Sequence, residues 1–210
     1  MGRHTGPTDR LSRREGINLM LKPIRSRSAK MPLEKEWRRF PPGMHGWRRS
    51  KVSEYGRRLR EKQKVKRYYG VRDKQFLRYF RRAERLRGNT GELLLQLLER
   101  RLDNVVCKLA FGMSRPQARQ MVSHGHVRVN GRRVNIPSYQ VDVGDVISIK
   151  DSDRSKKLAR ENLEIASAWG LQSWLIRDDN ALTGTVVGLP TREDVEIPIE
   201  EQLIVELCSR

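Results

Sequence analysis

The sequence predicts an α+β fold in which most of the helices precede the strands. Between residues 53 and 111, apolar residues recur every three or four positions, which is the period of an amphipathic helix. After residue 126 they alternate in short runs, and Asn130-Gly131 between two such runs is a strong hairpin signal. Residues 1–50 are rich in Gly, Pro and Arg, which predicts an extended basic segment with little core of its own.

Three helices are expected in the middle of the chain. Ser53 can cap the first, at 53–69, and Gly70 can end it. The second should span about 73–87. Asn89, followed by Glu92, resembles a capping box and opens a third helix whose apolar positions continue to Leu109. The residues expected to face the core from the first two helices are Tyr55, Leu59, Phe76, Leu77, Phe80, Ala83 and Leu86.

A shorter helix and several strands should follow. Ser114, with Pro116 in the first turn, can cap a helix that runs to Gly125. The hairpin at Asn130-Gly131 should have its return strand at Val134 and Ile136. The remaining expected elements are a strand at 146–149, a helix at 155–169, and strand-like runs near 174–176 and 185–187.

The charge is concentrated near the N-terminus. The formal net charge is +19, and residues 1–100 contain 29 basic and 10 acidic side chains, whereas residues 151–210 contain 7 basic and 12 acidic ones. Such a density of positive charge repels itself unless a polyanion neutralises it. Nucleic acid is the polyanion that fits, because cationic side chains displace its condensed counterions.

Other classes of protein are disfavoured. No run of 18 apolar residues is present, so no membrane span is expected, and no apolar stretch near the start suggests a secretion signal. The two cysteines, Cys107 and Cys208, lie in apolar runs and give no sign of an oxidising compartment. We therefore expect a cytoplasmic protein without a small-molecule substrate.

Several motifs resemble a known family. Residues 98–106 and 114–134 resemble the S-four RNA-binding module, in which two helices and a β-hairpin form a basic surface that continues here into a small antiparallel sheet. The resemblance to the bacterial small-subunit ribosomal protein number four extends over nearly the whole chain, through the residues at 13–16, 42–46, 59–64, 69–71, 88–92, 136–139 and 201–206.

The resemblance implies a ribosomal RNA-binding protein of the small ribosomal subunit, with no enzymatic activity and no cofactor. Family members bind the 5′ domain of 16S ribosomal RNA and nucleate assembly. They also contact neighbouring ribosomal proteins, including number five, and line the messenger RNA entrance, with a role in translational accuracy. The implied segments are a basic arm at 1–50, a helical domain at 51–92, the S-four module at 93–150, and a tail at 151–210 that packs back on the rest.

The candidate site residues are basic or polar side chains on the predicted helices, the hairpin and the N-terminal segment. At the messenger entrance, the family positions are Arg48 and Lys51. Arg115 and Arg119 share a predicted polar helix face, so their removal is expected to weaken RNA binding without unfolding the chain. The full set expected to contact ribosomal RNA is Arg3, Arg13, Arg14, Arg49, Arg57, Arg58, Arg60, Lys62, Lys64, Lys66, Arg67, Arg78, Arg82, Arg115, Arg119, His124, Arg128, Asn130 and Arg132.

Alternatives remain at this point. Some of these arginines could serve intramolecular ion pairs, and the two helices around Ser114 also permit a helix-turn-helix DNA binder. Arg101-Leu102-Asp103 is similar to the aspartate motif of RNA pseudouridine synthases, although no further domain could hold a catalytic pocket. His124 and His126 suggest a metal pair, RNA stacking or plain packing; because no third ligand lies near them, we expect no metal there.

The N-terminal segment lacks the ligands for structural zinc. Many members of the family hold zinc there with four cysteines, and the matching positions are Asp9, Ser12, Ser26 and Met31. None of these residues is a thiolate or an imidazole, the donors of a structural zinc site.

We predict that elemental analysis of the purified protein will find no stoichiometric zinc. Because no zinc is needed, a chelator should leave the affinity for RNA unchanged. Near-stoichiometric zinc that a chelator removes together with RNA affinity would contradict this prediction.

Overall fold

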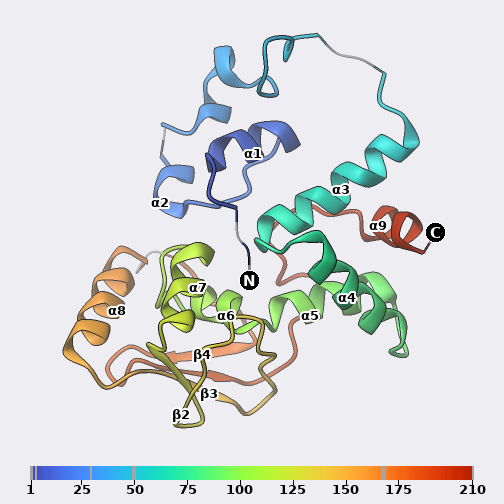
Figure 1. The fold of residues 1–210 in the computed structure, drawn as a ribbon. Helices are drawn as coiled ribbons and strands as arrows, with labels where there is room; N and C mark the ends of the chain where they lie inside the picture. The colour runs from blue at the N-terminus through green and yellow to red at the C-terminus, as the bar shows by residue number, and fades with distance from the viewer. Residues whose placement is uncertain (1, 3, 29, 49–50, 167–168, 210) are drawn as a thin grey trace. The chain divides into compact units, whose positions relative to one another are not determined.

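A computed structural model describes residues 2, 4–28, 30–48, 51–166 and 169–209 (Figure 1). The chain forms two compact units. Unit 1 contains residues 1–94 and 197–210, and unit 2 contains residues 95–196. The end of the chain therefore belongs to the same unit as its beginning, a division different from the four consecutive segments expected from the sequence.

The N-terminal segment is helical in places, not extended as expected. It contains α1 (Thr8–Glu15), α2 (Pro23–Ser26) and two 3-10 helices, η1 (Pro32–Glu34) and η2 (Glu36–Arg38). Gly16 ends α1 in the left-handed conformation with φ of 70°. The segment also has buried apolar residues, which are Leu19, Leu21 and Met31. Gly16 thus ends one short helix, and Pro23 and Pro32 begin two others.

The next two helices form as predicted. In α3 (Glu54–Tyr68), the Ser53 hydroxyl accepts a hydrogen bond from the Gly56 N–H at 3.2 Å. Gly70, with φ of 63°, separates α3 from α4 (Asp73–Glu84). The buried residues are Val65, Tyr68, Tyr69, Val71, Phe76, Tyr79, Phe80 and Ala83.

Two of the expected core residues of these helices are exposed. Tyr55 lies in the first turn of α3, whose buried residues, Val65 and Tyr68, lie near its C-terminal end. Leu86 follows the last residue of α4 and is therefore no longer on the helix face that it was expected to share.

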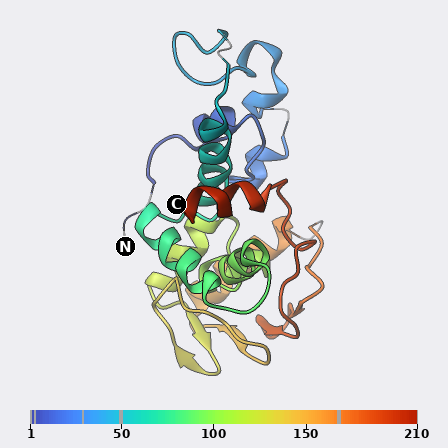
Figure 2. The ribbon, with the colours of Figure 1, turned by 90° about the vertical axis from the view of Figure 1, so that its right-hand side faces the viewer.

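The last helix of the chain, α9 (Glu201–Cys208), completes unit 1 by packing beside α3 (Figures 1 and 2). Ile204 and the preceding Ile197 and Ile199 are buried. Arg58 donates a hydrogen bond from Nε to Glu206 at 2.7 Å, so an ion pair accompanies the apolar contact.

The third predicted helix is broken into two. α5 (Thr90–Glu99) ends before Arg100, and α6 (Leu102–Lys108) begins after Arg101. The break forms because the backbone there pairs with residues 137–141. The Leu102 N–H donates to the Tyr139 carbonyl at 2.9 Å, and the Arg100 carbonyl accepts from the Val141 N–H at 3.0 Å. These bonds replace the helical ones that a continuous helix would make.

Unit 2 is built around a five-stranded antiparallel sheet. Its strands are β1 (Val127–Val129), β2 (Arg132–Arg133), β3 (Val146–Ile149), β4 (Leu175–Asp178) and β5 (Thr183–Val186), in the order β2-β1-β3-β5-β4. Asn130 and Gly131, with φ of 49° and 77°, make the predicted tight turn. The return strand is at Arg132–Arg133 and not at Val134 and Ile136, because the two-residue turn pairs Val129 directly with Arg132.

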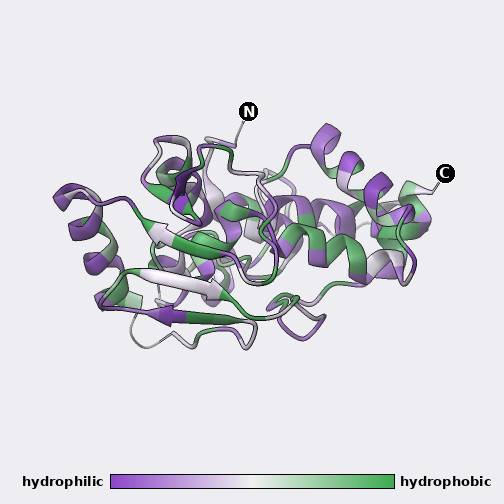
Figure 3. Cartoon of the chain, turned by 90° about the horizontal axis from the view of Figure 1, so that it is seen from below, coloured by the Kyte–Doolittle hydropathy of each residue, from purple (hydrophilic) through white to green (hydrophobic). Residues whose placement is uncertain are grey.

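Helices α6 and α7 (Arg115–Ser123) lie over one face of this sheet, and α8 (Asp153–Ala166) contacts β3, its central strand (Figure 1). The core combines residues of α6, α7, α8 and the strands, among them Val105, Met121, Ile147 and Ala159. Several helices carry alternating hydrophilic and hydrophobic bands, as amphipathic helices do (Figure 3). No helix in the described part of the chain is long and apolar enough to cross a membrane.

A polar network is buried where α5, α6 and α7 meet. The Arg101 side chain is fully buried and donates from Nε to Asp103 at 3.0 Å and from a terminal nitrogen at 2.5 Å. Arg119 lies 3.6 Å from the same carboxylate. Asn104 donates to the Glu99 carboxylate at 2.6 Å and accepts from Arg115 Nε at 2.8 Å. Arg115 and Arg119 of the predicted polar face therefore point into the protein.

We predict that Asp103→Ala will lower the free energy of unfolding by about 3–5 kcal/mol, because it takes a carboxylate away from buried Arg101. As a matched control, Asp142→Ala removes a 75% exposed carboxylate that pairs with Arg100. This substitution should cost less than about 1 kcal/mol. Urea denaturation measures both values, and a loss for Asp103→Ala as small as the one expected for Asp142→Ala would show that the buried network is not stabilising.

Candidate RNA-binding surface

The cations of α3 are paired with acids of unit 1. The sequence contains few acids at the neighbouring i,i+4 positions, so it suggests that these charges are free. Four of the acids come instead from other segments, and two, Glu54 and Glu61, lie within α3 at i,i+3 positions; the four from other segments are Glu15, Asp73, Glu200 and Glu206. The pairs are Arg57 with Glu54 and Glu200, Arg58 with Glu206, Arg60 and Arg67 with Glu15, Lys62 and Lys66 with Asp73, and Lys64 with Glu61.

Two of these carboxylates, Asp73 and Glu15, have pKa values shifted in opposite directions. Hydrogen bonding from Lys66 holds the pKa of Asp73 below its ordinary value. Burial raises the pKa of Glu15, although Arg67 and Arg60 act in the opposite direction. The Glu15 side chain is only 1% exposed, and its Oε2 atom has no hydrogen-bond partner among the described residues. Glu15 is therefore an interior anchor for α3.

The basic side chains on the outer face of α4 differ from those of α3 in having no acidic partner among the described residues. These side chains are exposed, and no ion pair or hydrogen bond is found for them within the described ranges. They lie opposite the buried face formed by Phe76, Phe80 and Ala83. We call this surface the α4 strip, and its members are Lys74, Arg78, Arg81, Arg82 and Arg85. Only Arg78 and Arg82 belong to the site set expected from the sequence.

In unit 2, exposed cations gather at the hairpin. Arg132 and Arg133 form β2 and are both exposed, and Arg128 of β1 pairs with Arg133 across the ladder. Asn130 plays a structural part. Its side-chain amide donates to Asp145 at 2.7 Å and its oxygen accepts from the Val146 N–H at 2.9 Å. Asn130 therefore fixes the turn that presents the arginines.

His124 and His126, which follow α7, differ in their exposure and hydrogen bonding. His124 is exposed, whereas His126 shares a 2.9 Å hydrogen bond between Nδ1 and the Ser155 hydroxyl. Burial lowers the pKa of His126, and His124 and Lys150 act in the same direction. Among the described residues, no group of three or more metal-binding side chains is present. His126 therefore packs in unit 2, and His124 is the one available to a ligand.

The basic residues of the N-terminal segment partly hold its own backbone. Arg13 donates from Nε to the carbonyls of Arg38 and Phe40 at 2.9 and 3.0 Å, and Arg14 donates to that of Pro42 at 3.2 Å. Arg48 lies over the Trp47 ring, 4.9 Å from its centroid. Lys51 is exposed. Arg3 and Arg49, also expected at the RNA surface, lie outside the described residues.

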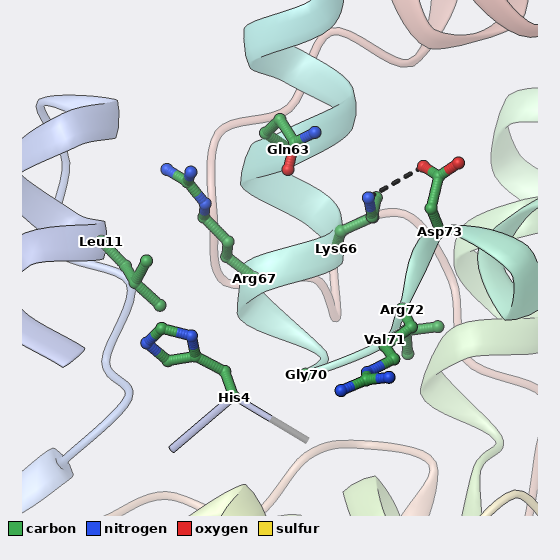
Figure 4. Close-up of a pocket in the computed structure, with 9 residues that line it drawn as sticks. All are labelled: His4, Leu11, Gln63, Lys66, Arg67, Gly70, Val71, Arg72 and Asp73. Atoms are coloured by element: carbon green, nitrogen blue, oxygen red, sulfur yellow. Dashed lines mark hydrogen bonds and ion pairs between the residues drawn. The ribbon is translucent and has the colours of Figure 1, made fainter. Parts of the chain in front are cut away.

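A cavity of about 430 Å³ lies between the start of the chain and the end of α3 (Figure 4). His4, Arg67 and Arg72 approach it from different segments. Two of its cations are already committed, because Lys66 donates to Asp73, which also lines the cavity, and Arg67 pairs with Glu15. Burial also lowers the pKa of Arg67. This cavity is therefore a weaker anion site than its residue types suggest.

Comparison with known proteins decides the family. Residues 3–99 match the ribosomal protein S4/S9 N-terminal domain, and residues 100–147 match the S4 domain. The chain is 54% identical to the small ribosomal subunit protein uS4 of Thermoanaerobacter sp. (strain X514) and 53% identical to the uS4A protein of Symbiobacterium thermophilum, over 210 residues that cover the whole of each chain. The chain belongs to the uS4 family.

Membership in the uS4 family confirms several expectations. The family consists of ribosomal proteins that are not enzymes, and this member carries the RNA-binding S4 domain. Its bacterial relatives are named for the small subunit of the ribosome, a cytoplasmic particle, which agrees with the location expected from the sequence. Asp103, the residue of the apparent pseudouridine synthase motif, is held between Arg101 and Arg119 in the buried network.

The four positions at which the resemblance implied zinc cysteines in related proteins make other contacts here. Asp9 forms an ion pair with Arg25 at 2.9 Å, and the buried Ser12 hydroxyl accepts from the Leu19 N–H at 3.4 Å. The Ser26 carbonyl accepts from the Asn18 amide at 2.9 Å, and Met31 is buried. At these four positions, an ion pair, two hydrogen bonds and a buried apolar side chain hold the N-terminal segment together.

Proposed function

We propose that this uS4 family member is a structural constituent of the small ribosomal subunit that binds the 5′ domain of 16S ribosomal RNA and nucleates assembly. The observation that carries the proposal is the set of exposed cations without acidic partners, among the described residues, on the α4 strip and at Arg132 and Arg133 of the hairpin. Guanidinium groups suit phosphate oxygens, and RNA helices expose phosphates and 2′-hydroxyls more readily than base edges.

The alternative of a helix-turn-helix DNA binder is less consistent with the packing of α7. A recognition helix needs outward side chains that reach the base edges of the major groove. Arg115 and Arg119 instead bond to Asn104 and approach Asp103. A polycation without specificity remains a competing function, and binding to one RNA junction in moderate salt would exclude it.

We predict that Arg78→Ala with Arg82→Ala will weaken binding to the 5′-domain RNA and leave the melting temperature unchanged. The slope of log affinity against log salt should fall by about 1 for each phosphate that the variant no longer binds. The matched control is Arg57→Ala with Arg58→Ala, which removes two charges that are already paired and should change the slope less.

Footprinting on the protein's own small-subunit ribosomal RNA tests the function itself. The wild-type protein should protect one set of 5′-domain sites. Its affinity should fall roughly 10³–10⁵-fold between 50 and 200 mM salt if about 6–10 phosphates are contacted. A flat salt response, or protection of no defined site, would refute the proposal.

The finer role at the messenger entrance is also part of the proposal, as are contacts with neighbouring small-subunit proteins, including number five. Arg48 and Lys51 occupy the family positions, and both side chains are exposed. Cations of this kind can hold a moving single strand without reading its sequence, which would support translational accuracy.

We predict that Arg48→Gln with Lys51→Gln will slow translation through structured messenger RNA and leave subunit assembly intact. In this proposal the two side chains contact the messenger and not the ribosomal RNA, so their charges are not needed for assembly. Translation rates on structured and unstructured messengers, compared with the yield of assembled subunits, measure this. If assembly fails first, the two residues bind ribosomal RNA instead.

A further inference from the structure

A second cavity in unit 1 concentrates positive charge. It has a volume of about 800 Å³, within the range of roughly 300–1,000 Å³ that is usual for small-molecule sites. Five arginines from three segments line it: Arg14 of α1, Arg39 and Arg48 of the segment between η2 and α3, and Arg60 and Arg67 of α3. We call it the arginine pocket.

The charge of the arginine pocket is only partly neutralised. No acidic side chain is among its described lining residues. The acid that pairs with its arginines is Glu15, which bonds Arg60 at 3.5 Å and also Arg67. Glu15 occupies Arg60 and Arg67, and Arg14 donates to the Pro42 carbonyl. The exposed Arg39, for which no partner is found in the described ranges, is therefore the pocket charge most available to an anion. The pocket is therefore suited to an anion.

The shape and the other walls narrow the choice of anion. Phe40 and His45 also line the pocket, and Phe40 is 42% exposed. A simple oxyanion would leave these rings and most of the volume unused, and an RNA duplex is too wide to enter. A nucleotide has both a phosphate for the arginines and a planar base for the rings. Unpaired RNA bases are commonly recognised by stacking on aromatic side chains or on guanidinium planes.

The wall that carries Phe40 is held in place before any ligand binds. Arg13 bonds the Phe40 carbonyl at 3.0 Å, and Arg14 bonds the Pro42 carbonyl at 3.2 Å. Gly46 lies so close to the Pro41 carbonyl that an added Cβ would collide with it, so this close approach of the loop to itself requires glycine. A wall fixed in this way reduces the entropy that ligand binding must overcome.

We propose that the arginine pocket holds one unpaired nucleotide of an RNA strand, with its phosphate on Arg39 and its base against Phe40 and His45. This inference rests on the proposed RNA-binding function and assigns one subsite of it. The base contact is independent of the α4 strip, so the two contributions can be separated by mutation.

The test uses the full-length protein and the 5′-domain RNA. Phe40→Leu keeps the apolar volume but removes the ring, and together with His45→Ala it should weaken RNA binding roughly 5- to 150-fold, the loss expected for one stacked base. Chemical probing should show one unpaired nucleotide that the wild type protects and this variant leaves reactive, with the duplex protections unchanged. The matched control is Trp37→Ala, which removes a 67% exposed ring outside the pocket lining and should have little effect.

A second variant tests the phosphate half. Arg39→Gln removes an exposed pocket charge for which no partner is found in the described ranges, and it should weaken binding without lowering the melting temperature. If wild-type protein binds the RNA but both pocket variants bind equally well, the pocket assignment is wrong and the RNA-binding function stands. If wild-type protein does not bind, the function itself fails. Tight, saturable binding of adenosine or guanosine 5′-monophosphate would assign the pocket to free nucleotides and overturn the assignment to RNA.

Discussion

The ion pairs between α3 and distant acids are the interaction on which unit 1 depends. α3 carries its cations on almost every side, and such a helix repels itself and its neighbours unless the charges are compensated. Glu15 compensates two of them from α1, Asp73 two from the start of α4, and Glu200 and Glu206 two from the C-terminal segment. The ion pairs of Glu200 and Glu206 join the C-terminal segment to α3, as the apolar contacts of α9 also do.

This pairing decides which charges remain for a partner. Cations bonded to carboxylates must break those bonds before they can bind phosphate, and their net gain is small. The α4 strip has no such cost, since its side chains extend from a helix fixed on its other face by Phe76 and Phe80. The hairpin arginines are equally available on a turn that Asn130 and Asp145 hold. Helical charge density alone is thus a poor guide to the RNA-binding face.

Local signals in the sequence were sufficient for much of the fold. Ser53 and Gly70 define the ends of α3, and Asn130-Gly131 defines the turn, because caps and tight turns depend on neighbouring residues only. The break at Arg101 could not be predicted in this way, since it depends on backbone pairing with residues 137–141. The arginine pocket was also missed, because Arg14, Arg39 and Arg60 converge only in three dimensions. The RNA assignment of single residues came from family resemblance.

Arg115 and Arg119 show why a polar helix face is ambiguous. A row of arginines on one helix face indicates exposure to solvent or to a ligand only when no buried acid or amide lies opposite. Here Asp103 and Asn104 lie opposite the two arginines. These contacts contradict the free polar face on which the expectation of unchanged stability rested, and we now expect each substitution to lower stability because it would leave a buried polar group short of a partner. Weaker RNA binding in such a variant would not distinguish a direct contact from an unfolded module. The hairpin and the α4 strip, whose side chains support no buried network among the described residues, are the places where binding and stability can be measured apart.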